Sequence, residues 1–191
     1  MKQKVSGRRA FVKTCVTAAT AVVANPVLLA SNSPMRQYQR SMLVDEEGNP
    51  LTTAMLETDM PFIFHYPFVT TPCFLVNLGK PLSTGRELQT ATEGHYTWQG
   101  GAGPSNQIVA FSAICSHKLS YPTKTMSFLN YRSEKVRFVS RAEGVKEQRQ
   151  LIYCCSERSA YDPAKGAEVL GGPATQPLAA VELEYDQQND Q

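Results

Sequence analysis

Residues 151–163 read LIYCCSERSAYDP, and the interpretation of the whole chain depends on this stretch. It begins with a short apolar run that is typical of a β-strand. It then places Cys154 and Glu157 three positions apart in what reads as a turn. Thiolate and carboxylate groups are both donors that proteins use to bind metals. The stretch therefore indicates one half of a candidate metal site.

A second stretch supplies the other half. Residues 114–122 read ICSHKLSYP and follow the strand candidate QIVAFSAIC, so that Cys115 and His117 share one tight loop. Two loops at strand ends with four potential ligands are the arrangement that a small metal cluster requires. The candidate ligands are Cys115, His117, Cys154 and Glu157.

Length and charge limit the other possibilities. The chain has 191 residues, and 42% of them are apolar, which is enough for one packed domain with an extension. Residues 1–33 carry five bases and no acid, so the rest of the chain has 14 bases and 17 acids. This mildly acidic body has no basic stripe, which argues against binding to nucleic acid.

The N-terminal region, residues 1–33, resembles a twin-arginine export signal. Arg8 and Arg9 are followed by Phe11 and Lys13, and an uncharged stretch then runs from Thr14 to Met35. That pathway exports folded proteins, commonly with a cofactor in place.

As a hydrophobic helix, the 22 uncharged residues would measure about 33 Å, just enough to cross a bilayer. A cleaved signal and a retained anchor formed by residues 10–31 both remain open. In either case we expect the body of the protein in the periplasm.

The remaining chain predicts short strands. Residues 34–60 are polar and are expected to form a linker, whereas residues 61–191 contain apolar runs bounded by Pro, Gly and Asn. KVRFVSRAEGVKEQRQLIYC predicts two strands joined by a charged turn at 142–148, and AVELEYD predicts an edge strand. No long helix is indicated after residue 35. The fold class is therefore predicted to be mostly β and antiparallel.

These motifs resemble those of the Rieske [2Fe–2S] proteins. SAICSHK matches the first ligand box, SAYDP matches the end of the second, and GGPATQPLAAVELEYD matches the loop that shields the cluster and the closing strand. HYPFVTTPCFLVNLG and GGAGPSNQIVAFSAICSHK are most similar to the small subunit of arsenite oxidase and its relatives. The resemblance covers roughly residues 61–186.

The resemblance implies an antiparallel β-sandwich with a two-loop tip that binds the cluster within about residues 108–175. Two thiolates hold one iron in this family, and two imidazoles hold the other. Counting back from Asp162, Cys154 falls on the ligand cysteine and Glu157 on the second ligand histidine. An alternative register, with Cys155 as the ligand cysteine, would put Arg158 in the place of that histidine. A guanidinium group has no free lone pair for iron, so the first register is preferred.

Two further departures from the family pattern concern the loops. Ser120 and Ser156 occupy the positions at which quinol-oxidising members carry a cysteine pair that forms a disulfide. The 36 residues between His117 and Cys154 are more than the compact boxes of the family contain. We therefore expect an inserted hairpin that contains residues 131–150.

The resemblance implies an electron-transfer subunit, not an enzyme on its own, in an exported oxidoreductase complex. Its partners would be a larger catalytic subunit of the molybdopterin type and a cytochrome-like acceptor. The alternative is a subunit that has lost its [2Fe–2S] cluster and keeps a structural or assembly role in a membrane or periplasmic complex. The replacement of a ligand histidine by Glu157 leaves both functions open.

Three other residues were weighed as ligands. His95 is a candidate substitute imidazole, although its sequence context is that of a solvated loop. His65 lies on a strand candidate and is expected to be structural. Cys73 has no Cys or His at ligand spacing, so we expect it to be a small buried side chain.

Overall fold

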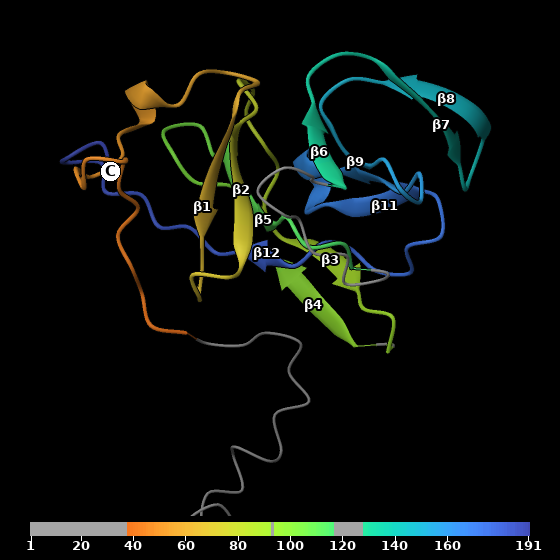
Figure 1. The fold of residues 1–191 in the computed structure, drawn as a ribbon, viewed down its shortest axis with the longest axis horizontal. Helices are drawn as coiled ribbons and strands as arrows, with labels where there is room; N and C mark the ends of the chain where they lie inside the picture. Colours follow the sequence, from red (N-terminus) through yellow and green to blue (C-terminus); the bar gives the residue numbers. More distant parts are fainter. Residues whose placement is uncertain (1–37, 93, 117–127) are drawn as a thin grey trace, which may run out of the picture. The chain divides into compact units, whose positions relative to one another are not determined.

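The computed structural model describes residues 38–92, 94–116 and 128–191. The predicted export segment and the expected hydrophobic helix at residues 10–31 lie outside these ranges. Within them the chain is mostly β with antiparallel strand pairing, so the predicted fold class is confirmed (Figure 1). The helices among these residues are two 3₁₀ turns, η1 (Thr53–Met55) and η2 (Pro163–Lys165). No helix in the described ranges is long and apolar enough to span a bilayer.

Within the described residues, three antiparallel sheets make up the fold. The first contains, in spatial order, β1 (Pro61–His65), β2 (Pro72–Asn77), β5 (Ile108–Ser112) and β12 (Ala180–Val181). The second contains β6 (Leu129–Arg132), β9 (Leu151–Cys154), β10 (Ala160–Asp162), β11 (Glu168–Gly171), β7 (Val136–Ser140) and β8 (Gly144–Gln148). β3 (Arg86–Gln89) and β4 (His95–Trp98) form a two-stranded sheet.

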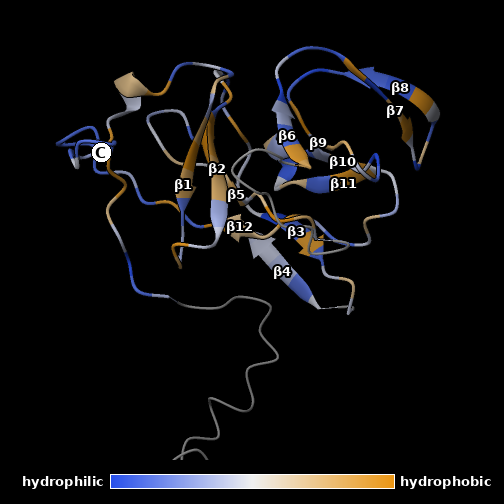
Figure 2. Ribbon diagram, viewed as in Figure 1, coloured by the Kyte–Doolittle hydropathy of each residue, from blue (hydrophilic) through white to orange (hydrophobic). Residues whose placement is uncertain are grey.

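Strand β2 lies between two apolar clusters. Its side chains alternate between the two faces of the sheet, as in any strand. Phe74 and Val76 belong to the larger cluster, whereas Cys73 and Leu75 belong to the smaller one. This explains why β2 is a continuous apolar run in the sequence, coloured as such in Figure 2. Cys73 is a buried core residue, as expected.

The segment that the sequence assigns to a linker packs onto the first sheet. Leu51 is buried in the smaller cluster, and the Thr53 hydroxyl donates to Asp190 at 2.6 Å. Asn77 donates from its side chain to the carbonyl of Leu56 at 3.0 Å. Residues before β1 thus help to cover the sheet.

Two strand predictions were wrong in detail. Residues 144–148, predicted as part of a charged turn, form strand β8, and the turn is confined to residues 141–143. Gly144, with a φ of 75°, closes this tight hairpin, and charged residues are tolerated on the exposed edge strand. AVELEYD forms a strand only at Ala180 and Val181. If the pairing with β5 continued, Leu183 would lie opposite Ile108, but Ile108 pairs with Ala102 instead.

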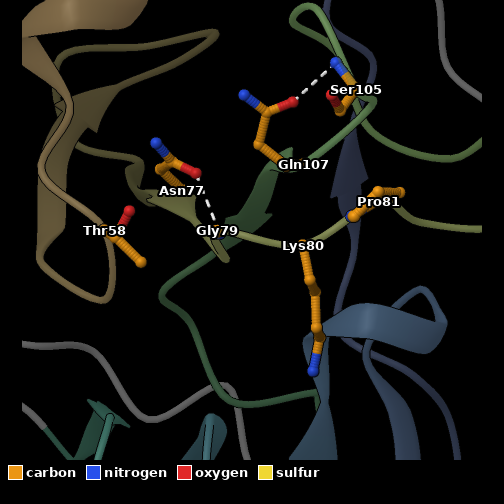
Figure 3. Close-up of a pocket in the computed structure, with 7 residues that line it drawn as sticks. All are labelled: Thr58, Asn77, Gly79, Lys80, Pro81, Ser105 and Gln107. Carbon is orange, nitrogen blue, oxygen red and sulfur yellow. Dashed lines mark hydrogen bonds between the residues drawn. The ribbon is translucent and has the colours of Figure 1, made fainter.

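A small polar pocket of about 200 Å³ lies at the end of β2 (Figure 3). Asn77 accepts the backbone N–H of Gly79 at 2.9 Å, and Gln107 accepts that of Ser105 at 2.8 Å. The Lys80 ammonium points away from these groups and donates to the Gln150 side chain at 2.6 Å. The lysine therefore serves as a link to the second sheet.

Asp59 is the centre of the polar contacts between the first two sheets. Its carboxylate accepts the Tyr131 hydroxyl at 2.6 Å and the Gln150 amide at 2.7 Å. The same amide donates to the carbonyl of Leu78 at 2.9 Å. Burial raises the pKa of Tyr131 above its ordinary value, and the hydrogen bond to Asp59 raises it further. The tyrosine therefore stays a neutral donor to the Asp59 side chain.

We expect Tyr131→Phe to lower the free energy of unfolding by about 1 to 2 kcal/mol, because a partly buried carboxylate loses one of its two donors. Urea denaturation followed by circular dichroism measures this. Tyr66→Phe is the control, since its hydroxyl makes only an exposed 3.3 Å contact with the carbonyl of Gln39. Equal effects of the two substitutions would contradict a role for Asp59 in joining the sheets.

Candidate metal centre

The two candidate loops follow strands of different sheets. β5 ends at Ser112, three residues before Cys115, and β9 ends at Cys154 itself. The backbone N–H of Cys154 donates to the carbonyl of Ser159, and the N–H of Arg158 donates to the carbonyl of Cys154, both at 2.8 Å. These two hydrogen bonds close the turn that begins at Cys154. The backbone position of Cys154 is therefore determined by the pairing of β9 with β10.

The structure brings the thiols of Cys115 and Cys154 together. Both residues are 0% exposed, and their side chains interact directly. The Tyr161 hydroxyl lies 3.9 Å from the Cys115 sulfur and is also buried. Two residues 39 positions apart in the sequence thus form one buried sulfur pair beneath a tyrosine.

Burial is the main cause of a raised pKa at Cys154, and the neighbouring Cys115 raises it further. The backbone N–H groups of Glu157 and Ser156 donate to the Cys154 sulfur and act in the opposite direction. Burial also raises the pKa of Tyr161 above its ordinary value. The sulfur pair is therefore desolvated, yet donors for a thiolate are already in place.

Ser116 is a residue of the site that the sequence analysis did not select. Its hydroxyl lies 3.2 Å from that of Tyr161 and donates to the carbonyl of Gln176 at 3.0 Å. It thus connects the loop that carries Cys115 to the tyrosine and to a third loop, residues 172–176. The signal that could have identified it is its position between Cys115 and His117.

The third loop contains Gly172, whose φ of 83° favours glycine. A Cβ atom at this position would lie 2.5 Å from the Cα of Ser159. The fully buried Ser159 hydroxyl in turn accepts the backbone N–H of Ala174 at 3.2 Å. The third loop is therefore in direct backbone contact with the loop that carries Cys154.

The structure separates the two adjacent cysteines. Cys154 is buried next to Cys115, whereas Cys155 is exposed, with the side chains of Asn130 at 3.6 Å and Arg132 at 3.7 Å from its sulfur. The register that makes Cys154 the candidate ligand thus assigns this role to the buried cysteine of the two.

The other candidate ligands are less well placed or not described. Glu157 is half-buried in the turn, and His117 lies outside the described residues, as does Ser120. No group of three or more His, Cys, Asp and Glu side chains that could hold a metal is found in the described part of the chain. His65 and His95 are exposed at strand ends. The described site is thus a pair of sulfur donors.

These residues suit one half of a [2Fe–2S] cluster. Two buried sulfurs face each other, and backbone N–H groups donate to one of them, which stabilises the thiolate form that iron requires.

No protein-family model matches the chain. Among solved structures, the chain is similar to the soluble domain of the Rieske protein II (soxF) from Sulfolobus acidocaldarius, with 27% sequence identity and a TM-score of 0.43. The match covers 67% of this chain and 63% of that one. The chain therefore spans less than two thirds of the length of this relative.

We expect Gly172→Ala to destabilise the fold by more than about 3 kcal/mol. The new Cβ would overlap the backbone of Ser159, and the alanine would be held at a positive φ that is strained for it. Gly144→Ala is the matched control, since its φ of 75° is similar but no atom lies within 4 Å of the added Cβ. The control should lose only about 1 to 2 kcal/mol. Urea unfolding of both variants measures the difference, and equal losses would show that the contact with Ser159 is unimportant.

Proposed function

We propose that this protein is a Rieske-type iron–sulfur electron-transfer subunit of an exported oxidoreductase complex. The observation that carries the proposal is the buried pair of Cys115 and Cys154, delivered by strands of two sheets. The two ligand-box motifs, the tyrosine above the pair and the glycine loop beside it support the same function.

Each residue of the site has a proposed role. Cys115 and Cys154 hold one iron through their thiolates, and His117 and Glu157 bind the other. A bound [2Fe–2S] cluster supplies the capacity to take up and release one electron. The backbone N–H groups of Ser156 and Glu157 donate towards the Cys154 sulfur, which favours the more negative state, and the Tyr161 hydroxyl lies 3.9 Å from the Cys115 sulfur.

The exclusion of water from the sulfur pair is the second contribution of the chain. Cys115, Cys154 and Tyr161 are all 0% exposed, so their hydrogen bonds act in a surrounding of low polarity. The site is thereby preorganised for a change of charge without rearrangement of its own side chains.

Glu157 sets this site apart from one with two histidines. A carboxylate carries a negative charge where imidazole is neutral, so a cluster bound through Glu157 has one additional negative charge. We expect a lower reduction potential and, at most, one histidine that couples electron transfer to proton transfer.

The proposed partners follow from the same resemblance. A larger catalytic subunit of the molybdopterin type supplies single electrons, and a cytochrome-like protein accepts them, with His117 as the exit. Residues 1–33 direct the protein to the periplasm, where residues 10–31 either anchor it in the inner membrane or are removed.

The departure at Glu157, which stands where the resemblance places a ligand histidine, leaves a second candidate function. A subunit without a cluster, which uses this fold for docking or assembly in a membrane or periplasmic complex, is consistent with that exchange.

Iron analysis of the full chain, produced in its native host, separates the two functions. A carrier should contain about two irons per chain and show a rhombic electron paramagnetic resonance signal when reduced. Cys154→Ser should abolish both, whereas Cys155→Ser should retain them because Cys155 lies outside the buried pair. Iron-free protein that still assembles with its partners would exclude the carrier function and favour the scaffold.

The role of Glu157 is tested by the reduction potential of loaded protein. Exchanging two thiolates for two imidazoles raises such potentials from about −400 mV to about −150 to +300 mV, so Glu157→His should raise it by about 100 mV or more. Protein-film voltammetry gives the value. Glu157→Asp retains the charge and serves as the control. A potential that does not respond to Glu157→His would show that residue 157 is not a ligand.

A further inference from the structure

A hollow of about 420 Å³ lies between the β7–β8 hairpin and the end of strand β9. The hairpin forms one edge of the six-stranded sheet, and β8 has no partner on its outer side within the described residues (Figure 1). The residues that matter for its chemistry are Arg137, Val139, Val145, Tyr153 and Arg158. None of their side chains is used by the candidate metal centre, although the Arg158 backbone N–H helps to close the turn at Cys154.

The hollow has an exposed apolar centre. Val139 and Val145 are cross-strand partners, and they are 67% and 57% exposed. Valine side chains in a strand usually face a core. In this hairpin the core side chain is Phe138, which lies on the opposite face from the two valines. Figure 2 shows hydrophobic residues on both strands of the hairpin. A valine pair on the outer face of an edge hairpin is a feature of contact surfaces.

Two arginines border this apolar centre. Arg137 and Arg158 make no side-chain hydrogen bond or ion pair with any described residue. Glu147 lies opposite Arg137 in the strand register but forms no ion pair with it. Both guanidinium groups are therefore available to carboxylates of another molecule.

The charge of this region is opposite to that of the remaining body. Residues 129–158 contain seven bases and four acids, whereas the rest of residues 34–191 contains seven bases and 13 acids. This hairpin region, residues 129–158, therefore carries a net charge of +3, whereas the rest of the body carries −6. A partner with an acidic surface is attracted to this region and repelled by the rest of the body.

The hollow adjoins the loop that carries Cys154. Tyr153 directly precedes that cysteine in β9, and the backbone N–H of Arg158 donates to the Cys154 carbonyl at 2.8 Å. A molecule seated in the hollow would therefore contact residues on both sides of the proposed cluster ligand.

We propose that the face formed by Arg137, Val139, Val145, Tyr153 and Arg158 docks an acidic electron-transfer protein. The inference rests on the proposed function and adds the surface on which the acceptor docks. Apolar contact at the centre with arginine and tyrosine around it is the composition typical of protein interfaces. In the transfer, one electron passes from the reduced chain to the ferric haem of a cytochrome, which becomes ferrous, and no bond forms or breaks.

The experiment uses the full chain in detergent solution and a small acidic c-type cytochrome as the probe. Stopped-flow absorbance measures the rate of electron transfer, and biolayer interferometry measures binding. Both should weaken as ionic strength rises. Arg137→Glu and Arg158→Glu should each lower the second-order rate constant about tenfold at low salt and weaken binding. A basic cytochrome with the same haem type should show the opposite response to both substitutions.

Arg40→Glu is the charge-matched control. Arg40 is exposed and lies outside the hairpin region, and its replacement by Glu changes the net charge by the same amount. A rate lowered equally by Arg40→Glu would overturn the proposal, since the effect would then come from net charge alone. Rates and binding that are unaffected by all three variants would also overturn it.

The two readouts separate this proposal from the one on which it rests. Binding that depends on Arg137 and Arg158 without any electron transfer would support the docking face and exclude the carrier function. Electron transfer that is insensitive to both arginines would support the carrier and exclude this face. Circular dichroism of each variant verifies that the fold is retained.

Discussion

The structure of the site depends on one constraint, the burial of two cysteine side chains against each other. Cys115 and Cys154 follow strands of different sheets, so the pair forms only when both sheets place their loops at the same point. Tyr161 covers the pair, and Ser116 holds the tyrosine hydroxyl. Because a buried thiolate is costly, the N–H groups that point at Cys154 are the part of this arrangement that a merely apolar core would not need.

The strands between the two candidate loops add surface to the second sheet. In the second sheet, β9, β10 and β11 form a central unit, β6 pairs with the free edge of β9, and β7 meets β11 through Ser140 and Gly171. Strand β6 and the β7–β8 hairpin therefore cover the two edges of the unit that carries Cys154. This position allows the hairpin to differ in charge from the remaining body while the pairing of β9 with β10 stays intact.

The sequence predicted what depends on short-range pattern and missed what depends on distant contacts. Motif spacing selected Cys154 over Cys155, and the structure buries the first and exposes the second. The role of Ser116 could not be predicted, because its partner Gln176 is 60 positions away. Strand β8 was missed for a different reason: its charged side chains resemble a turn, although they are tolerated on an exposed edge.

The fold alone does not distinguish a carrier from a scaffold, for a physical reason. Neutral thiols pack as small apolar groups, so Cys115 and Cys154 stabilise the core whether or not iron is bound. Tyr161 and Ser159 likewise have protein partners in the structure without a metal. A chain that lost its cluster would thus keep the same shape, and selection for stability alone would preserve the pair. The distinction rests on two features that matter for a bound cluster, namely the N–H donors that favour the thiolate of Cys154 and the carboxylate of Glu157.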